Sequence, residues 1–166
     1  MKSDPDRSQR LTELQLCLGK ALWQIQAFED TLAHLIAVVL KMPARASLKE
    51  AEAILEKVQG NTLGRLIRET KKAIHFDESF DPFMTRFLNE RNWLVHHSWR
   101  TYHGFLDKPN EYKTLLLRVR GLAADAIEFN ELFFGFLQDW AKERGVTTAE
   151  IDQVQRQFLD VWQEET

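Results

Sequence analysis

Hydrophobic residues recur along most of the chain at intervals of three, four and seven, which is the spacing of amphipathic helices. This spacing predicts a first long helix over residues 8–41, ended by Pro43. It predicts a second long helix over residues 111–144, with Gly145 as its C-terminal stop. The first helix is expected to bury Leu11, Leu14, Leu18, Ala21, Leu22, Ile25, Phe28, Leu32, Leu35, Ile36 and Val39. The second is expected to bury Leu115, Leu116, Val119, Leu122, Ala126, Phe129, Leu132, Phe133, Phe136, Leu137 and Trp140.

Shorter helices are predicted around these two. Ser47 is a good N-cap, and Glu50 three residues later completes a capping box for a helix that ends near Val58. Residues 62–74 predict another helix with an apolar inner side and a basic outer side. The basic side is formed by Arg65, Arg68, Lys71 and Lys72, and is either a solvated face or a guide for an RNA backbone. A final helix after residue 147 carries Ile151, Val154, Phe158, Val161 and Trp162.

The composition favours an all-α protein. Seven glycines and four prolines in 166 residues leave few turn residues for a β fold, and 44% hydrophobic residues suffice for a core. We expect a flexible N-terminus over residues 1–7 and a single domain over residues 8–166, folded as an antiparallel helical bundle.

Charge and cysteine content restrict the setting. The net charge of -3 gives no overall attraction to nucleic acid, so RNA binding needs a local basic cluster. Cys17 is the only cysteine, which excludes an intramolecular disulfide and fits a reducing, cytoplasmic setting. The polar N-terminal sequence is unlike a signal peptide, and the apolar run over residues 35–40 is too short to span a membrane.

The stretch over residues 83–103, FMTRFLNERNWLVHHSWRTYH, places chemically active groups inside an apolar helical pattern. We expect one long helix, in which Asn92, His96, Trp99 and His103 form a stripe apart from the core-facing one. The core-facing stripe is Phe80, Phe83, Phe87, Leu94, Val95 and Tyr102. Arg91 and His96 are about 140° apart around such a helix.

Arg91-Asn92-x-x-x-His96 resembles the RNxxxH signature of the HEPN superfamily, and Glu90 before the arginine fits the resemblance. HEPN domains are all-α, and many are metal-independent ribonucleases whose cleft gathers the motif from two protomers. The resemblance implies an endoribonuclease of the toxin or phage-defence type. It also implies a homodimer that acts on RNA, with an antitoxin or regulatory protein as a further partner.

The residues suit RNA cleavage without a metal or other cofactor, because RNA supplies its own 2′-hydroxyl nucleophile. His96 can move the proton, and Arg91 can hold the phosphate oxygens and offset their charge. Asn92 is a supporting residue that can orient the phosphate or the histidine, and His97 ranks second to His96. Glu90 is expected to pair with Arg91 of a second subunit or with Arg86, or to be simply exposed. Upstream, Asp77, Glu78 and Asp81 fit a helix start better than a metal site.

Two other hypotheses stay open. One is a non-catalytic HEPN-like module that binds a nucleotide or a second subunit through Arg91 and His96. The other is a plain helical interaction protein, in which Arg91 pairs with a core carboxylate and His96 is buried. Some HEPN toxins are regulated at a tyrosine two residues after the histidine; Ser98 holds that position here, and Tyr102 does not match it.

Overall fold

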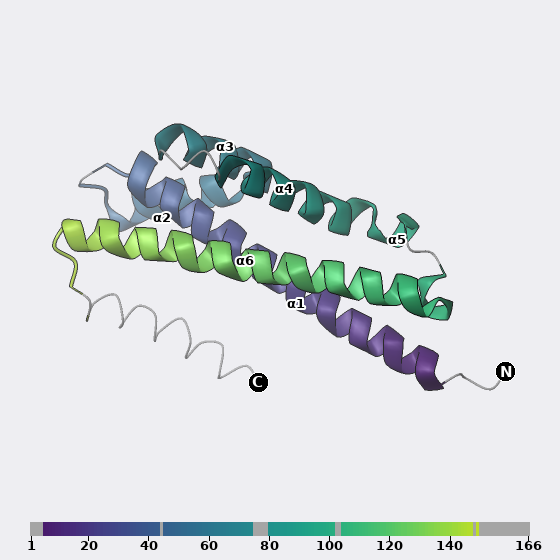
Figure 1. Ribbon diagram of the computed structural model, residues 1–166. Helices are drawn as coiled ribbons and strands as arrows, with labels where there is room; N and C mark the ends of the chain where they lie inside the picture. The colour runs from purple at the N-terminus through teal and green to yellow at the C-terminus, as the bar shows by residue number, and fades with distance from the viewer. Residues whose placement is uncertain (1–4, 44, 75–79, 102–103, 148, 150–166) are drawn as a thin grey trace. The chain divides into compact units, whose positions relative to one another are not determined.

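The computed structural model describes residues 5–43, 45–74, 80–101, 104–147 and 149. Every regular element in these ranges is a helix, which confirms the predicted all-α class (Figure 1). The expected final helix, together with Tyr102 and His103, lies outside the described residues. In chain order the elements are α1 (Pro5–Leu35), the π-helix η1 (Ile36–Lys41), α2 (Leu48–Gln59), α3 (Leu63–Ala73), α4 (Phe80–His96), α5 (Ser98–Thr101), the 3₁₀ helix η2 (Phe105–Asp107) and α6 (Pro109–Glu143).

The chain divides into two compact units, residues 1–130 and 131–166. The boundary falls inside the continuous helix α6, so the division does not follow a linker. A single domain over residues 8–166 stays a prediction. The candidate site lies entirely in the first unit.

Three phenylalanines from three helices form the centre of the first unit. The Phe28 ring of α1 stands edge-on to Phe87 of α4, with centroids 5.4 Å apart, and stacks on Phe129 of α6 at 5.5 Å. Phe87 is also edge-on to Phe129, at 5.2 Å. Edge-to-face pairs are favourable because the positive ring edge meets a negative ring face. This cluster fixes α4 against both long helices.

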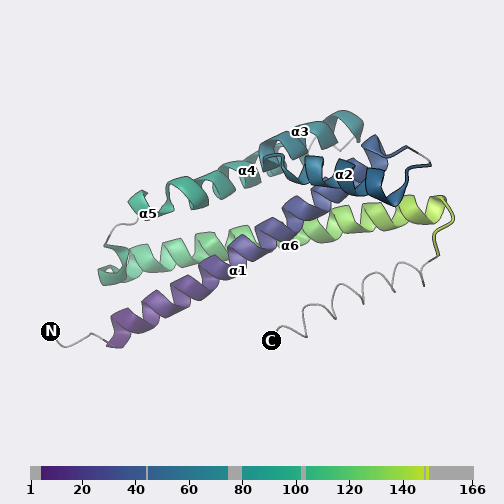
Figure 2. The same ribbon diagram turned by 180° about the vertical axis from the view of Figure 1, so that it is seen from behind.

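Within residues 1–130 the two long helices run in the same direction, as Figures 1 and 2 show. Tyr112, near the start of α6, donates a hydrogen bond to Glu13 of α1, and farther along Thr31 bonds to Asn130. Between α4 and α6, Arg86 pairs with Asp125 and Glu90 pairs with Arg118. The later residue of α4 thus meets the earlier residue of α6, so these two helices are antiparallel.

The first helix differs from its prediction in two ways. It begins at Pro5 rather than Ser8, since a proline costs nothing in the first helical turn. Leu11 and Leu22, which were expected to be buried, are 39% and 41% exposed. Both lie at the edges of the buried stripe, where spacing alone does not decide burial. The predicted end at Lys41 is confirmed, although the last six residues form a π-helix.

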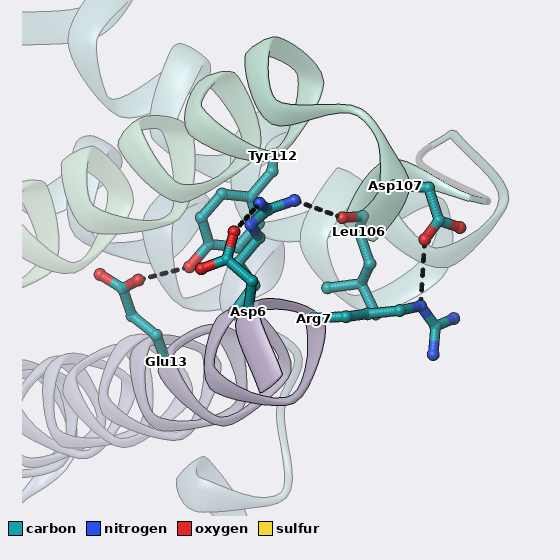
Figure 3. A network of polar contacts seen from close by, with 7 residues as sticks. Asp6, Arg7, Glu13, Leu106, Asp107 and Tyr112 are labelled. Atoms are coloured by element: carbon teal, nitrogen blue, oxygen red, sulfur yellow. Dashed lines mark hydrogen bonds and ion pairs between the residues drawn. The ribbon is translucent and has the colours of Figure 1, made fainter. Parts of the chain in front are cut away.

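Polar contacts attach the start of α1 to η2 and α6 (Figure 3). Arg7 Nε lies 3.1 Å from Asp107 Oδ1, and Arg10 donates to the Leu106 carbonyl at 2.8 Å. The Tyr112 hydroxyl donates to Glu13 Oε2. Burial, followed by this contact with Glu13, raises the pKa of Tyr112 to about 12. These contacts keep the N-terminal part of α1 beside α6.

Local signals set the ends of the short helices. The predicted capping box is confirmed, because the Ser47 hydroxyl accepts from the Glu50 amide while the Glu50 carboxylate accepts from the Ser47 amide. Gly60 then closes α2. On the inner side of α3, Leu63, Leu66 and Ile67 are buried, as predicted.

In the second unit, α6 ends at Glu143, and Gly145 follows with a left-handed φ of 86°. Glycine adopts this conformation without strain, which supports the predicted stop. Leu132 and Phe136 are exposed, contrary to expectation. None of the helices in the described part of the chain combines the length and hydropathy needed to span a membrane.

Candidate functional site

The motif residues lie on α4, whose inward side is set by the buried Phe87 and Leu94. Relative to Phe87, each residue advances about 100° around the axis, which places Arg91 about 40° and His96 about 180° away. The helix therefore holds Arg91 at the rim of its buried side. His96 lies on the opposite, outer side.

Glu29 of α1 holds the guanidinium of Arg91. Its Oε1 accepts hydrogen bonds from Arg91 Nε at 3.1 Å and from Nη2 at 2.9 Å, and both side chains are 25% exposed. A longer contact of 3.4 Å joins Arg91 Nη1 to Asn92 Oδ1. Because the guanidinium is planar and always charged, two donors on one oxygen fix its orientation. Arg91 and Asn92 are thus brought together.

The sequence pattern does not single out Glu29, although a signal is present. In the sequence, Glu29 follows Phe28 and comes three residues before Leu32, and both of these residues are fully buried. Glu29 therefore stands at the edge of the apolar stripe of α1. A charge in such a place requires a partner. The identity of that partner is not encoded in the spacing.

His96 is exposed at the end of α4, so the structure does not bring it to Arg91 within one chain. The hypothesis of a plain bundle with a buried His96 is wrong on this point, although its carboxylate partner for Arg91 is present. Val95 and Trp99 beside it are 47% and 77% exposed. Val95 was expected to be buried; it lies about 80° around the axis from Phe87, outside the covered stripe. His96 thus stands on a partly apolar surface.

Glu90 has a partner that differs from the expected ones. Its carboxylate accepts two hydrogen bonds from Arg118 of α6, at 2.5 and 2.9 Å. The Arg118 guanidinium carbon also lies 3.4 Å from the centre of the Trp93 ring, a cation–π contact. Arg86, the expected partner on the same helix, instead pairs with Asp125 of α6. Glu90 therefore has a packing role within the described chain, because it joins α4 to α6.

One continuous helix was expected over residues 83–103. In the structure, the motif helix α4 ends at His96. His97 occupies a turn, and the four-residue α5 follows. The Ser98 hydroxyl donates to the Leu94 carbonyl at 2.6 Å, in competition with the backbone ladder. His97 is exposed, with its ring centroid 6.3 Å from that of His96.

Among the described residues, no three His, Cys, Asp or Glu side chains are grouped so as to hold a metal ion. No protein-family model, no curated protein and no solved structure matches the chain. The assignment of a function therefore rests on the motif and its geometry.

Proposed function

We propose that the protein is a metal-independent endoribonuclease of the HEPN type, with Arg91 and His96 as its catalytic residues. The observation that carries the proposal is the contrast on α4 between an arginine held in one orientation by Glu29 and an exposed histidine on the outer side of the same helix. A held guanidinium suits the recognition of a phosphate, and an accessible imidazole suits proton transfer.

In the proposed reaction, His96 removes the proton of a ribose 2′-hydroxyl, whose oxygen attacks the adjacent phosphorus. The bond to the 5′-oxygen of the next nucleotide breaks, and that oxygen takes up a proton as it leaves. The products are a 2′,3′-cyclic phosphate and a free 5′-hydroxyl. Arg91 offsets the charge that develops on the non-bridging oxygens. Asn92, which contacts Arg91, supports its position.

The site is proposed to form between two chains. In an isologous dimer, the same surface of each chain contacts the other, so Arg91 of one can face His96 of the other, and the reverse. The exposed Val95 and Trp99 provide apolar area beside His96 for such a contact. The cellular role proposed with it is a cytoplasmic toxin or phage-defence effector that an antitoxin or another regulator controls.

A non-catalytic, phosphate-binding or dimerisation module is the second candidate. It is favoured by the placement of Arg91 and His96 about 140° apart around α4, because Arg91 can then hold a phosphate or a second subunit without His96 taking part. Such a module would bind RNA or a nucleotide but would not cut RNA.

The test is end-group analysis of single-stranded RNA incubated in excess EDTA with wild type, Arg91→Ala and His96→Ala. We expect the wild type to leave cyclic phosphate ends and His96→Ala to be slower by roughly 10²- to 10⁴-fold. His34→Ala is the matched control, since His34 lies on α1 and contacts Asp30. Cleavage of DNA, loss of activity in EDTA, or full activity of His96→Ala would contradict the proposal.

Mixing two inactive variants tests the composite site. After subunit exchange, half of the dimers formed from Arg91→Ala and His96→Ala chains are mixed, and each holds one complete site. One quarter of all sites are then complete, so we expect about a quarter of the activity of the same amount of wild-type protein to return. Sedimentation should give about twice the chain mass of 19.5 kDa. An active monomer, or no recovery after proven exchange, would rule out a site shared by two chains.

A further inference from the structure

A row of charged side chains runs along the outer side of α3. Arg65, Arg68, Glu69 and Lys72 line an open depression there. Their spacing of three, four and seven residues places them on one side of the helix, opposite its buried side. Arg65, Arg68 and Lys72 are called the α3 cationic stripe below.

Glu69, the one carboxylate in this row, already pairs with two cationic side chains. Lys41, at the end of η1, places Nζ 2.7 Å from Glu69 Oε2, and Arg65 places Nε 3.1 Å from Oε1. The Lys41 contact lowers the pKa of Glu69, so the carboxylate is ionised at neutral pH. Four cationic groups therefore stand against one carboxylate, in a chain whose net charge is -3.

The remaining cations carry the excess charge. Arg68 and Lys72 are exposed, and in the part of the chain that the structure describes neither forms an ion pair. Lys71, the neighbouring lysine, is instead paired with Asp81 at 3.0 Å. A local excess of one sign on an otherwise acidic protein concentrates anionic ligands at that place. The charge thus points to a polyanion.

The stripe leads toward the motif. Gly64 of α3 lies against Leu88 of α4, where a Cβ on Gly64 would stand 3.5 Å from Leu88 Cδ2. Lys71 and Asp81 pair at the other end, so α3 and α4 are antiparallel. From Leu88, α4 rises about 12 Å to His96, and the stripe itself covers about 10 Å of α3. An extended polyanion bound along α3 and past the N-terminal end of this helix would continue over the outer side of α4.

We propose that the α3 cationic stripe binds the phosphate backbone of the single-stranded RNA that reaches His96. The inference rests on the proposed function for the identity of the polyanion. Recognition is by phosphate alone, so it carries no base sequence, and the affinity depends steeply on salt. Single-stranded DNA of the same sequence is expected to bind to the stripe without being cut.

The experiment separates binding from cleavage. The probe is a fluorescein-labelled single-stranded RNA with 2′-O-methyl riboses, whose blocked nucleophile prevents the proposed reaction. Its anisotropy is measured over a salt series with wild type and with the Arg68→Gln/Lys72→Gln variant. The matched control is Lys20→Gln/Lys113→Gln, which removes the same charge from exposed positions on α1 and α6.

We expect the α3 variant to bind about tenfold more weakly and the salt slope to fall by about 1.4, or about 0.7 for each lost phosphate contact. The control variant should keep its affinity and slope. Circular dichroism should give the same helical content for all three proteins, because the substituted side chains are exposed.

Unchanged binding by the α3 variant, or equal loss in the control, would overturn the proposal. Failure of the two proposals can be told apart. If wild type cuts no RNA but binds the probe through α3, the ribonuclease assignment fails and the stripe is supported. If wild type cuts RNA and the α3 variant binds and cuts equally well, the stripe is refuted and the ribonuclease assignment stands.

Discussion

Arg91→Ala would remove one half of a partly buried ion pair. Glu29, which is 25% exposed, would then keep its charge without the two guanidinium donors that it accepts from. Buried hydrogen bonds to charged groups contribute roughly 1.5–3 kcal/mol. Exposed ion pairs contribute roughly 0–1 kcal/mol, so a pair at this exposure should contribute about 1–2 kcal/mol. For a chain of this size, the melting temperature should fall by roughly 2–8 °C.

A double-mutant cycle with Glu29→Gln separates this structural effect from catalysis. Unfolding in urea, followed by circular dichroism, gives the free energy of each variant. Glu29→Gln/Arg91→Ala should be more stable than the sum of the single losses predicts, because no charge is left unpaired. On the proposed function, RNA cleavage by the double variant should stay as slow as that by Arg91→Ala, since the proposed phosphate ligand is still missing.

Two results would refute this reasoning. If the double variant regained RNA cleavage together with stability, Arg91 would act only as a structural residue. If the coupling energy stayed within about 0.3–0.5 kcal/mol, the ion pair would contribute nothing measurable. Arg86→Ala is the matched control on the same helix, since Arg86, which is 54% exposed, pairs with Asp125 and not with Glu29. It should cost at most about 1 kcal/mol and keep full activity.

Three further changes test the fold. Arg118→Ala breaks the double contact to Glu90, and urea unfolding should show a loss of about 1–3 kcal/mol; a loss below 0.5 kcal/mol would mean that this contact is not stabilising. Ser47→Ala removes the capping box and should lower the stability measured by thermal unfolding by about 1 kcal/mol, whereas Ser47→Asp should keep most of that stability. The pKa of Tyr112 is raised to about 12 in the folded chain, so its contribution to the free energy of unfolding is complete below pH 10 and is lost as the pH rises from 10 to 12. Urea unfolding over this pH range should show the loss in the wild type, and an equal loss in Tyr112→Phe would contradict this.

Local signals in the sequence predicted the helices well. The capping box at Ser47 was correct, and so was the end of the first helix before Pro43, because the residues that decide these features are neighbours in the chain. The break after His96 escaped prediction for a different reason. Apolar periodicity continues through the break, so the spacing of the hydrophobic residues carries no sign that α4 ends at His96.

The partners of the motif residues could not be predicted. Periodicity tells which side of a helix a residue occupies, but not which charged residue of another helix lies opposite. Glu29 is 62 residues from Arg91 in sequence, and Arg118 is 28 residues from Glu90. Either pairing requires the crossing of α4 with a long helix, which the phenylalanine cluster in the core determines.

The pairing with Glu29 also bears on whether one chain can assemble the site. His96 is about 140° around α4 from Arg91 and about 7.5 Å farther along its axis. For Arg91 to reach across, it would have to leave Glu29, at a cost of about 1–2 kcal/mol on the estimate above. A second chain that contacts the exposed surface at Val95 and Trp99 could bring its own arginine to His96 while both ion pairs stay intact. The ion pair between Arg91 and Glu29 thus favours a site shared between two chains over a site within one.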